Sequence, residues 1–173
     1  MTKEEMLAEL GDFGDDELRV ALHAGRALKA ARDQQFYFLH SFFRETFDME
    51  RWEETGECVV AMPQDELVWN PGGMVHWGVL AFLCDNAMGL ASHLASGRPG
   101  VTVDLGVKYH KPARGKILRA TASVLSCGST LVAARCQIHD ERGTLVASGT
   151  GTFYHRRARE GSGTADTLSD KLT

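Results

Sequence analysis

Residues 75–95 read VHWGVLAFLCDNAMGLASHLA, and this stretch decides the fold. After His76, the segment's Asp, Glu, His, Lys and Arg residues are limited to Asp85 and His93. It therefore has the length and low polarity of a helix that is buried on nearly every side. A carboxylate is costly to bury in such a helix unless it is paired, hydrated or used in chemistry. Asp85 is thus the first candidate functional residue.

A glycine-rich turn, Asn70-Pro-Gly-Gly-Met74, comes just before this helix. Backbone N–H groups at a helix N-terminus point toward the preceding turn, and the helix dipole stabilises negative charge there. The stretch therefore predicts an acid/base group together with a cradle for an oxyanion.

The composition is that of one soluble globular domain. The chain has 173 residues, 43% of them hydrophobic and 24% charged, which is enough for one substantial core and short for two. A formal net charge of −4 disfavours nucleic acid as a main partner, because phosphate neutralisation needs a basic surface.

The N-terminal sequence and the cysteine spacing both fit a reduced cytoplasmic compartment best. The N-terminal residues are acidic and lack the apolar core of a secretory signal. Polar residues interrupt the long apolar helix, which disfavours a membrane span. The cysteines are widely spaced and contain no C-x-x-C, so reduced thiols are expected at Cys58, Cys84, Cys127 and Cys136.

Two helical stretches are predicted within residues 1–50, as an extension packed on the domain. Asp15 or Asp16 can cap the first, whose apolar residues recur at helical spacing, namely Leu18, Leu22, Gly25 and Leu28. The second, residues 36–47, is rich in aromatic side chains. It is either an acyl-binding surface or plain packing against a sheet, and we favour packing.

The remaining pattern is that of β-strands. Residues 57–62 form a short strand, and residues 101–109 alternate apolar and polar side chains, which indicates a half-buried strand. Short turns, the first at residues 112–115, link this strand to three further strands, predicted at residues 116–127, 131–139 and 144–155. Such spacing is typical of an antiparallel meander of all four strands. The domain is expected to span residues 51–156, followed by a disordered polar tail at 157–173.

Together these elements predict an α+β fold with extra N-terminal helices. One antiparallel sheet wrapped around the long helix would give that helix the cover it needs. The sheet would keep open edges, and a dimer that pairs its edge strands would satisfy them.

This arrangement resembles the hotdog fold, and the residues resemble the PaaI-type branch of acyl-CoA thioesterases over about residues 55–155. In that family an Asn precedes a His-Gly-Gly motif by six residues, and an acidic residue follows the His by nine. Asn70, His76 and Asp85 have this spacing. The other matching points are Gly78, Val101-Thr-Val-Asp-Leu105, Tyr109, Pro112, Gly128 and Gly143-Thr-Leu-Val-Ala147.

The resemblance implies a thioester hydrolase that needs no metal or other cofactor, with coenzyme A as part of the substrate. Asp85 would activate a water molecule or attack the thioester carbonyl itself. The N–H of Trp77 or Gly78 would polarise that carbonyl, Asn70 would hold the thioester or the water, and Thr102 would orient the water. In this family the site usually forms between two subunits, so a homodimer or a dimer-of-dimers tetramer is expected.

Trp77 departs from the family, which has glycine there. A positive φ would strain a tryptophan by about 1–3 kcal/mol, whereas a helical conformation would leave its N–H available. We favour the helical conformation, and we expect His76 to shape the turn rather than to catalyse. A second hypothesis is a non-catalytic acyl-CoA-binding or sensing protein with Trp77 filling the site, and a hotdog hydratase or dehydratase is a weaker third.

Basic residues cluster around the end of the strand at 101–109. They form either a solvated face or a site for the phosphates of coenzyme A. The candidate substrate-binding residues are Lys108, Lys111 and Arg114, with Lys116 and Arg119 close by in the sequence. No nucleic-acid or membrane partner is expected.

Overall fold

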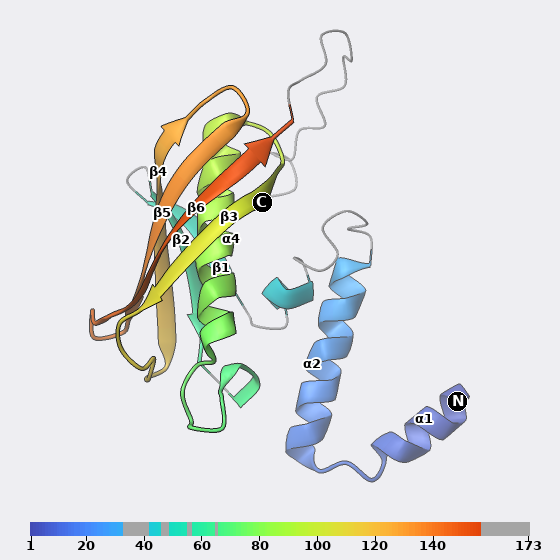
Figure 1. The fold of residues 1–173 in the computed structure, drawn as a ribbon. Helices are drawn as coiled ribbons and strands as arrows, with labels where there is room; N and C mark the ends of the chain where they lie inside the picture. Colours follow the sequence, from blue (N-terminus) through green and yellow to red (C-terminus); the bar gives the residue numbers. More distant parts are fainter. Residues whose placement is uncertain (33–41, 46–48, 55–56, 65, 157–173) are drawn as a thin grey trace, which may run out of the picture.

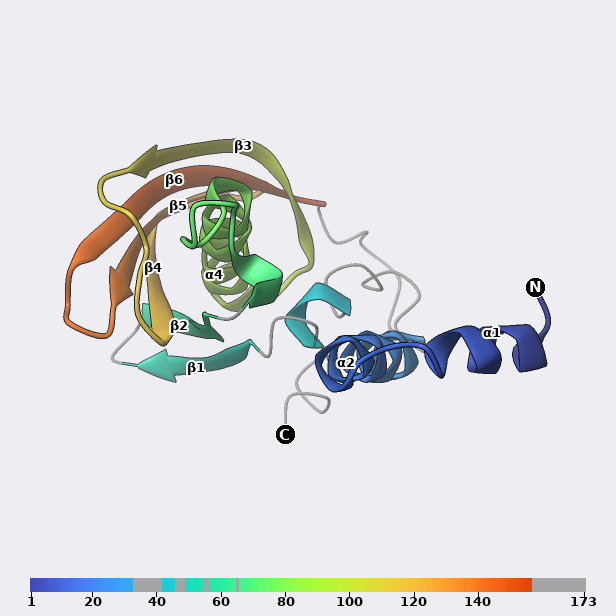
Figure 2. The ribbon, with the colours of Figure 1, turned by 90° about the horizontal axis from the view of Figure 1, so that it is seen from below.

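A six-stranded antiparallel sheet wraps around one long helix, α4, in the computed structural model (Figures 1 and 2). The structure describes residues 1–32, 42–45, 49–54, 57–64 and 66–156. This architecture confirms the predicted α+β hotdog fold. The predicted tail at 157–173 and most of the aromatic stretch at 36–47 lie outside the described residues.

The sheet has the strand order β1-β2-β4-β5-β6-β3, so the predicted meander is confirmed for β4, β5 and β6. It is wrong for β3, which pairs with β6 rather than with the next strand in the sequence, β4. One strand, β1, was not predicted. Its sequence is ERWEE, and such a charged strand at a sheet edge lacks the apolar alternation that identifies an inner strand. The strands are β1 (Glu50–Glu54), β2 (Glu57–Pro63), β3 (Gly100–Tyr109), β4 (Ile117–Cys127), β5 (Leu131–Asp140) and β6 (Leu145–His155).

Helix α4 (Trp77–Ser96) forms the centre of the core. It begins after the N-cap His76 and ends at Gly97, whose φ of 65° is the left-handed conformation typical of a helix C-terminus. By length and composition alone α4 could cross a membrane. However, its buried side chains pack against the sheet, as expected of the core helix of a globular domain.

The glycines of β6 let the sheet approach α4 closely. A Cβ atom added to Gly149 would lie 3.2 Å from Cys84 Sγ. Cys58, Cys84 and Cys136 are buried free thiols, as predicted, whereas Cys127 is exposed. Burial raises the pKa of the Cys58 thiol to about 11, so this cysteine is an unreactive part of the core.

Strand β3 differs from its prediction in two ways. A register shift between Thr102 and Asp104 places Thr102 opposite the core residue Phe153, so Thr102 lies on the face of β3 that is turned toward α4. The strict alternation predicted from the sequence does not allow for this bulge. Val101 and Val103 are also 53% and 58% exposed: Val101 pairs with Tyr154, which is itself 42% exposed, and Val103 lies at the register shift.

The N-terminal helices lie beside the sheet and α4 rather than among them (Figure 2). They are α1 (Lys3–Leu10) and α2 (Asp15–Ala31), and a short 3-10 turn, η1 (Glu66–Val68), precedes α4. Helix α2 begins at Asp15, so the prediction that Asp15 or Asp16 is its N-cap is wrong. The N-cap is Gly14, whose N–H donates to the Glu17 carboxylate over 2.8 Å.

Candidate active site

The carboxylate of Asp85 lies midway along α4 and is hydrogen-bonded to β3. The Thr102 hydroxyl donates to Asp85 Oδ1 over 2.8 Å. Burial raises the pKa of Asp85, and the Thr102 hydrogen bond partly opposes that shift. The β3 bulge turns Thr102 toward α4 and makes this contact possible. The result is a carboxylate of raised basicity that is held in one orientation.

An apolar wall lies one turn before Asp85. The ring of Phe82 packs edge-on against the ring of Phe43, with 5.2 Å between their centroids. Residues three positions apart share one face of a helix, so Phe82 and Asp85 point the same way from α4. The carboxylate therefore adjoins a surface suited to an apolar group.

The N-terminus of α4 offers one of the two predicted N–H donors. His76 Nδ1 accepts a hydrogen bond from the Gly78 N–H over 3.0 Å, so that donor is engaged. Within the described ranges, no acceptor is bonded to the Trp77 N–H. Trp77 is the first residue of α4 and its backbone is helical, so the strained alternative for this position is wrong. His76 shapes the turn, as expected.

Trp77 also joins α4 to the far end of β3. The Tyr109 hydroxyl donates to the Trp77 carbonyl oxygen over 3.0 Å, and the two ring centroids are 5.1 Å apart. Both side chains stay partly exposed, at 40% and 43%. The sequence offered Tyr109 only as a matching point of the family, because its contact with Trp77 depends on how β3 crosses α4.

Asn70 closes the turn in front of α4. Its Oδ1 accepts hydrogen bonds from the N–H of Gly72 over 2.9 Å and from that of Met74 over 3.4 Å. Gly73, with a φ of 68°, lets the chain reverse there. The oxygen of Asn70 is thus used by the turn, and among the described residues no hydrogen bond engages its Nδ2 group.

These residues form two separate groups within one chain. Thr102 lies beside Asp85, whereas Asn70 and His76 lie with Trp77 at the start of α4. Asp85 follows Trp77 by eight residues, which is about 12 Å along a helix axis. One chain therefore does not bring the Trp77 N–H and the Asp85 carboxylate to the same carbonyl group.

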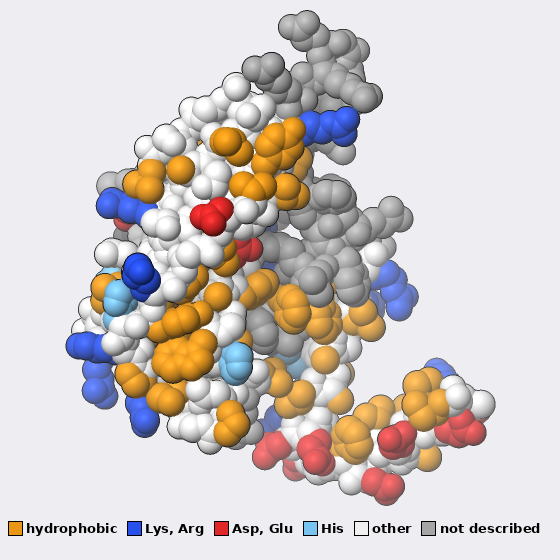
Figure 3. All heavy atoms as spheres, in the orientation of Figure 1, with side chains coloured by type: hydrophobic (Ala, Val, Ile, Leu, Met, Phe, Trp, Pro, Cys, Tyr) orange, Lys and Arg blue, Asp and Glu red, His pale blue; other side chains and the backbone are white. Residues whose placement is uncertain are grey.

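The predicted basic residues lie at the same end of β3 as Trp77. Lys108 is near the end of the strand, and Lys111 and Arg114 follow it in the exposed connection to β4. Lys and Arg side chains gather in this lower-left region of Figure 3, beside an apolar patch. Arg119 is separate from them, because its guanidinium lies over the Trp52 ring at 5.2 Å.

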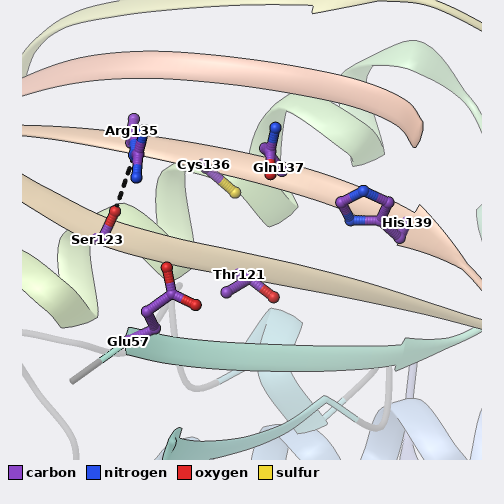
Figure 4. A pocket seen from close by; sticks show the side chains of 7 residues that line it. All are labelled: Glu57, Thr121, Ser123, Arg135, Cys136, Gln137 and His139. Carbon is purple, nitrogen blue, oxygen red and sulfur yellow. Dashed lines mark hydrogen bonds between the residues drawn. The ribbon is translucent and has the colours of Figure 1, made fainter. Parts of the chain in front are cut away.

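A polar hollow on the outer face of the sheet contains none of the predicted site residues (Figure 4). Within it Arg135 Nε donates to Ser123 Oγ over 3.0 Å. In the described part of the chain, no group of three or more His, Cys, Asp or Glu side chains is placed to hold a metal ion. The hollow is lined by Glu57, Thr121, Ser123, Arg135, Cys136, Gln137 and His139.

Comparison with known proteins identifies the family. The sequence pattern of the thioesterase superfamily matches residues 72–147. The medium/long-chain acyl-CoA thioesterase YigI of Escherichia coli K12 is 29% identical over 153 residues, covering 79% of this chain and 98% of that protein. The human acyl-coenzyme A thioesterase 13 is 34% identical over 102 residues, covering 57% and 73%.

Solved structures agree with these sequence matches. A Bacillus halodurans protein crystallised with CoA superimposes with a TM-score of 0.73 at 31% identity, covering 87% of this chain and 99% of that one. The chain therefore belongs to the thioesterase superfamily.

Proposed function

We propose that this protein is an acyl-CoA thioesterase that hydrolyses its substrate to free coenzyme A and a carboxylic acid. The observation that carries this proposal is the Asp85 carboxylate, which burial makes more basic and which the Thr102 hydroxyl holds beside an apolar wall. General bases work best when their pKa lies near the working pH, and burial moves a carboxylate in that direction. The proposed reaction uses no metal or cofactor.

The chemistry follows from the two groups of residues. Asp85 takes a proton from water as the water oxygen bonds to the thioester carbon, and negative charge moves to the carbonyl oxygen. The Trp77 N–H, at the positive end of the α4 dipole, stabilises that oxyanion. When the carbonyl re-forms, the C–S bond breaks, and the leaving thiolate takes the proton from Asp85. Direct attack by Asp85, with a mixed anhydride hydrolysed afterwards, uses the same residues.

The site is proposed to form between two copies of the chain. Thr102 and Tyr109 lie near opposite ends of β3, seven residues or about 23 Å apart along the strand. If the exposed edge of β3 pairs antiparallel with β3 of a second copy, the Tyr109 end of one strand lies beside the Thr102 end of the other. The Trp77 N–H of one subunit then faces the Asp85 carboxylate of its partner.

The same pairing accounts for the basic residues. Lys108, Lys111 and Arg114 lie beyond the Trp77 end of the site and are proposed to bind the phosphates of coenzyme A. This places positive charge at the substrate end although the chain as a whole has a net charge of −4. The acyl group would lie toward the wall formed by Phe43 and Phe82.

The proposal is tested by measuring thiol release from a panel of short, long and aryl acyl-CoAs. The wild-type protein should hydrolyse at least one class, and Asp85→Asn should lose nearly all of that activity. Asp12→Asn is a matched control, because Asp12 is an exposed aspartate in the turn between α1 and α2, away from α4 and β3. Full activity of Asp85→Asn would refute the role of Asp85. Tight acyl-CoA binding without thiol release would favour the non-catalytic binding protein instead.

A single turnover in ¹⁸O-labelled water separates the two proposed roles of Asp85. Label in the Asp85 carboxylate would show direct attack, whereas label confined to the released acid would favour general-base catalysis.

A further inference from the structure

Helix α2 carries two apolar faces, and its own chain covers one of them. Ala27 and Ala31 are 2% and 0% exposed. On the other face Leu18, Leu22 and Leu28 remain 39%, 55% and 46% exposed. Ala27 follows Leu18 by nine positions, and Ala31 follows Leu22 by nine, which is about 180° around a helix. Leu18 and Leu22 therefore point away from the covered residues, whereas Leu28, three positions before Ala31, lies at the margin between the two faces.

The exposed leucine face has small residues at its centre. We define this face as Leu18, Ala21, Leu22, Gly25 and Leu28. A glycine inside a helix costs about 1 kcal/mol of stability relative to alanine. A Cβ added to Gly25 would meet nothing within 4 Å, so no described part of this chain requires a glycine there. Close approach of a second helix would require it.

The spacing of the leucine face is that of a helix-pairing seam. Positions 18, 21, 25 and 28 alternate steps of three and four, as in the seam between two packed helices. If α2 pairs antiparallel with α2 of a second copy about a two-fold axis near position 23, Leu18 faces Leu28 and Ala21 faces Gly25. The small residues Ala21 and Gly25 then form a close contact at the centre of the helix pair, and the Leu18–Leu28 pairs lie on either side of it.

The charges on α2 favour a second copy as the occupant and fix its direction. Asp15 and Lys29 each lie seven residues from Leu22, so all three share one flank of the leucine face. Antiparallel pairing brings Asp15 of each copy beside Lys29 of the other. Parallel pairing would place the acidic first turns of the two helices together, at Asp15, Asp16 and Glu17.

We infer that α2 is a homotypic interface, paired antiparallel with α2 of a second copy of this chain. The helix has 17 residues, about 25 Å, and one face of it is smaller than the roughly 800 Å² that each partner buries in a standard interface. Pairing of α2 alone is therefore a weak interaction, which joins copies of the chain that also associate through other surfaces. It uses no residue of the proposed active site and does not depend on the proposed function.

Disulfide trapping in the full-length chain tests the pairing and its direction. The exposed Cys127 is first replaced by serine, since the other three cysteines are buried. In that background Leu18→Cys/Leu28→Cys should form a covalent dimer under mild oxidation, because each new thiol faces one on the second copy. Each single variant should stay monomeric on a denaturing gel. In the antiparallel pair its two thiols lie about 15 Å apart along the axis, beyond the reach of a disulfide.

Charge reversal gives an independent readout by sedimentation velocity. Asp15→Lys and Lys29→Asp should each weaken the concentration-dependent association, and the double variant should restore it. Leu22→Gln should also weaken association. Ala30→Gln should not, because Ala30 is an exposed residue of α2 that lies outside the leucine face.

Three outcomes would overturn the inference. Efficient cross-linking of Leu18→Cys alone would show parallel pairing. Absence of cross-linking in the double cysteine variant would show that α2 does not pair with itself. Association of Leu22→Gln and both charge variants at the wild-type level would show that this face carries no interface.

Discussion

Replacing Trp77 by proline deletes one backbone N–H from the proposed oxyanion site, together with the indole that packs on Tyr109. Trp77 is the first residue of α4, where proline is well tolerated because that N–H has no partner within the helix. The preceding residue, His76, has φ −62° and ψ 136°, which is the conformation that proline requires before it. The fold should therefore survive Trp77→Pro.

The expected loss follows from the number of donors available. Gly78 donates to His76, so Trp77 supplies the free N–H at the start of α4 among the described residues. Removal of one oxyanion donor typically lowers kcat by about 10²–10³, or about 2.7–4 kcal/mol. Trp77→Pro should lose activity by about that factor.

The comparison that isolates the N–H is with Trp77→Ala, which also lacks the indole but keeps the donor. Both variants are assayed for thiol release on the best substrate, with circular dichroism and thermal melting as checks of folding. If folded Trp77→Pro is as active as Trp77→Ala, the N–H of residue 77 does not stabilise the oxyanion.

Three further predictions concern the carboxylate and the basic residues. Thr102→Val removes the hydrogen bond that lowers the pKa of Asp85, so the acidic limb of the kcat/KM profile should move to higher pH. Activity on that limb should fall by about tenfold or more, since a hydrogen bond to a charged group contributes about 1.5–3 kcal/mol. Thr102→Ser should keep the wild-type profile, and an unshifted Thr102→Val profile would contradict the assignment. Because burial raises the pKa of Asp85 above its unfolded value, its contribution to stability is greatest at low pH and is lost as pH rises to the folded pKa. Asp85→Asn should therefore melt at a higher temperature than wild type at neutral pH, with the difference shrinking as the pH falls through the folded pKa of Asp85; a lower melting temperature at neutral pH would count against a desolvated carboxylate. Replacing Lys108, Lys111 and Arg114 together by glutamine should raise KM for acyl-CoA and weaken its dependence on salt while leaving kcat nearly unchanged, and an unchanged KM would place the phosphates elsewhere.

The parts of the fold that depend on local patterns could be predicted from the sequence. Residues 75–95 identify the core helix by their length and low polarity, and the observed helix is Trp77–Ser96. The glycine-containing turns at Gly128 and Gly143 separate strands that differ from their predicted bounds by one residue at most. Local propensity and distant packing agree in these segments, so the sequence is sufficient.

The parts that depend on pairing between distant segments could not be predicted. The β3 bulge arises from the register with β6, and it alone turns Thr102 toward Asp85. The His76–Gly78 hydrogen bond decides which N–H remains available, yet the spacing of the motif is compatible with either donor. Likewise, the sequence shows that α2 has apolar residues at helical spacing, but only the folded chain shows that the leucine face is left uncovered.

The central claim is that one active site combines the Asp85 carboxylate of one subunit with the Trp77 N–H of its partner. Its most direct test mixes two variants, Asp85→Asn and Trp77→Pro, that should each be nearly inactive alone. After subunit exchange at equal concentrations, about half of the dimers should contain one chain of each kind, and each of these has one intact site. We expect thiol-releasing activity to recover to about a quarter of the wild-type value. Activity no higher than the average of the two parents, with exchange verified by native mass spectrometry, would contradict a site shared between subunits.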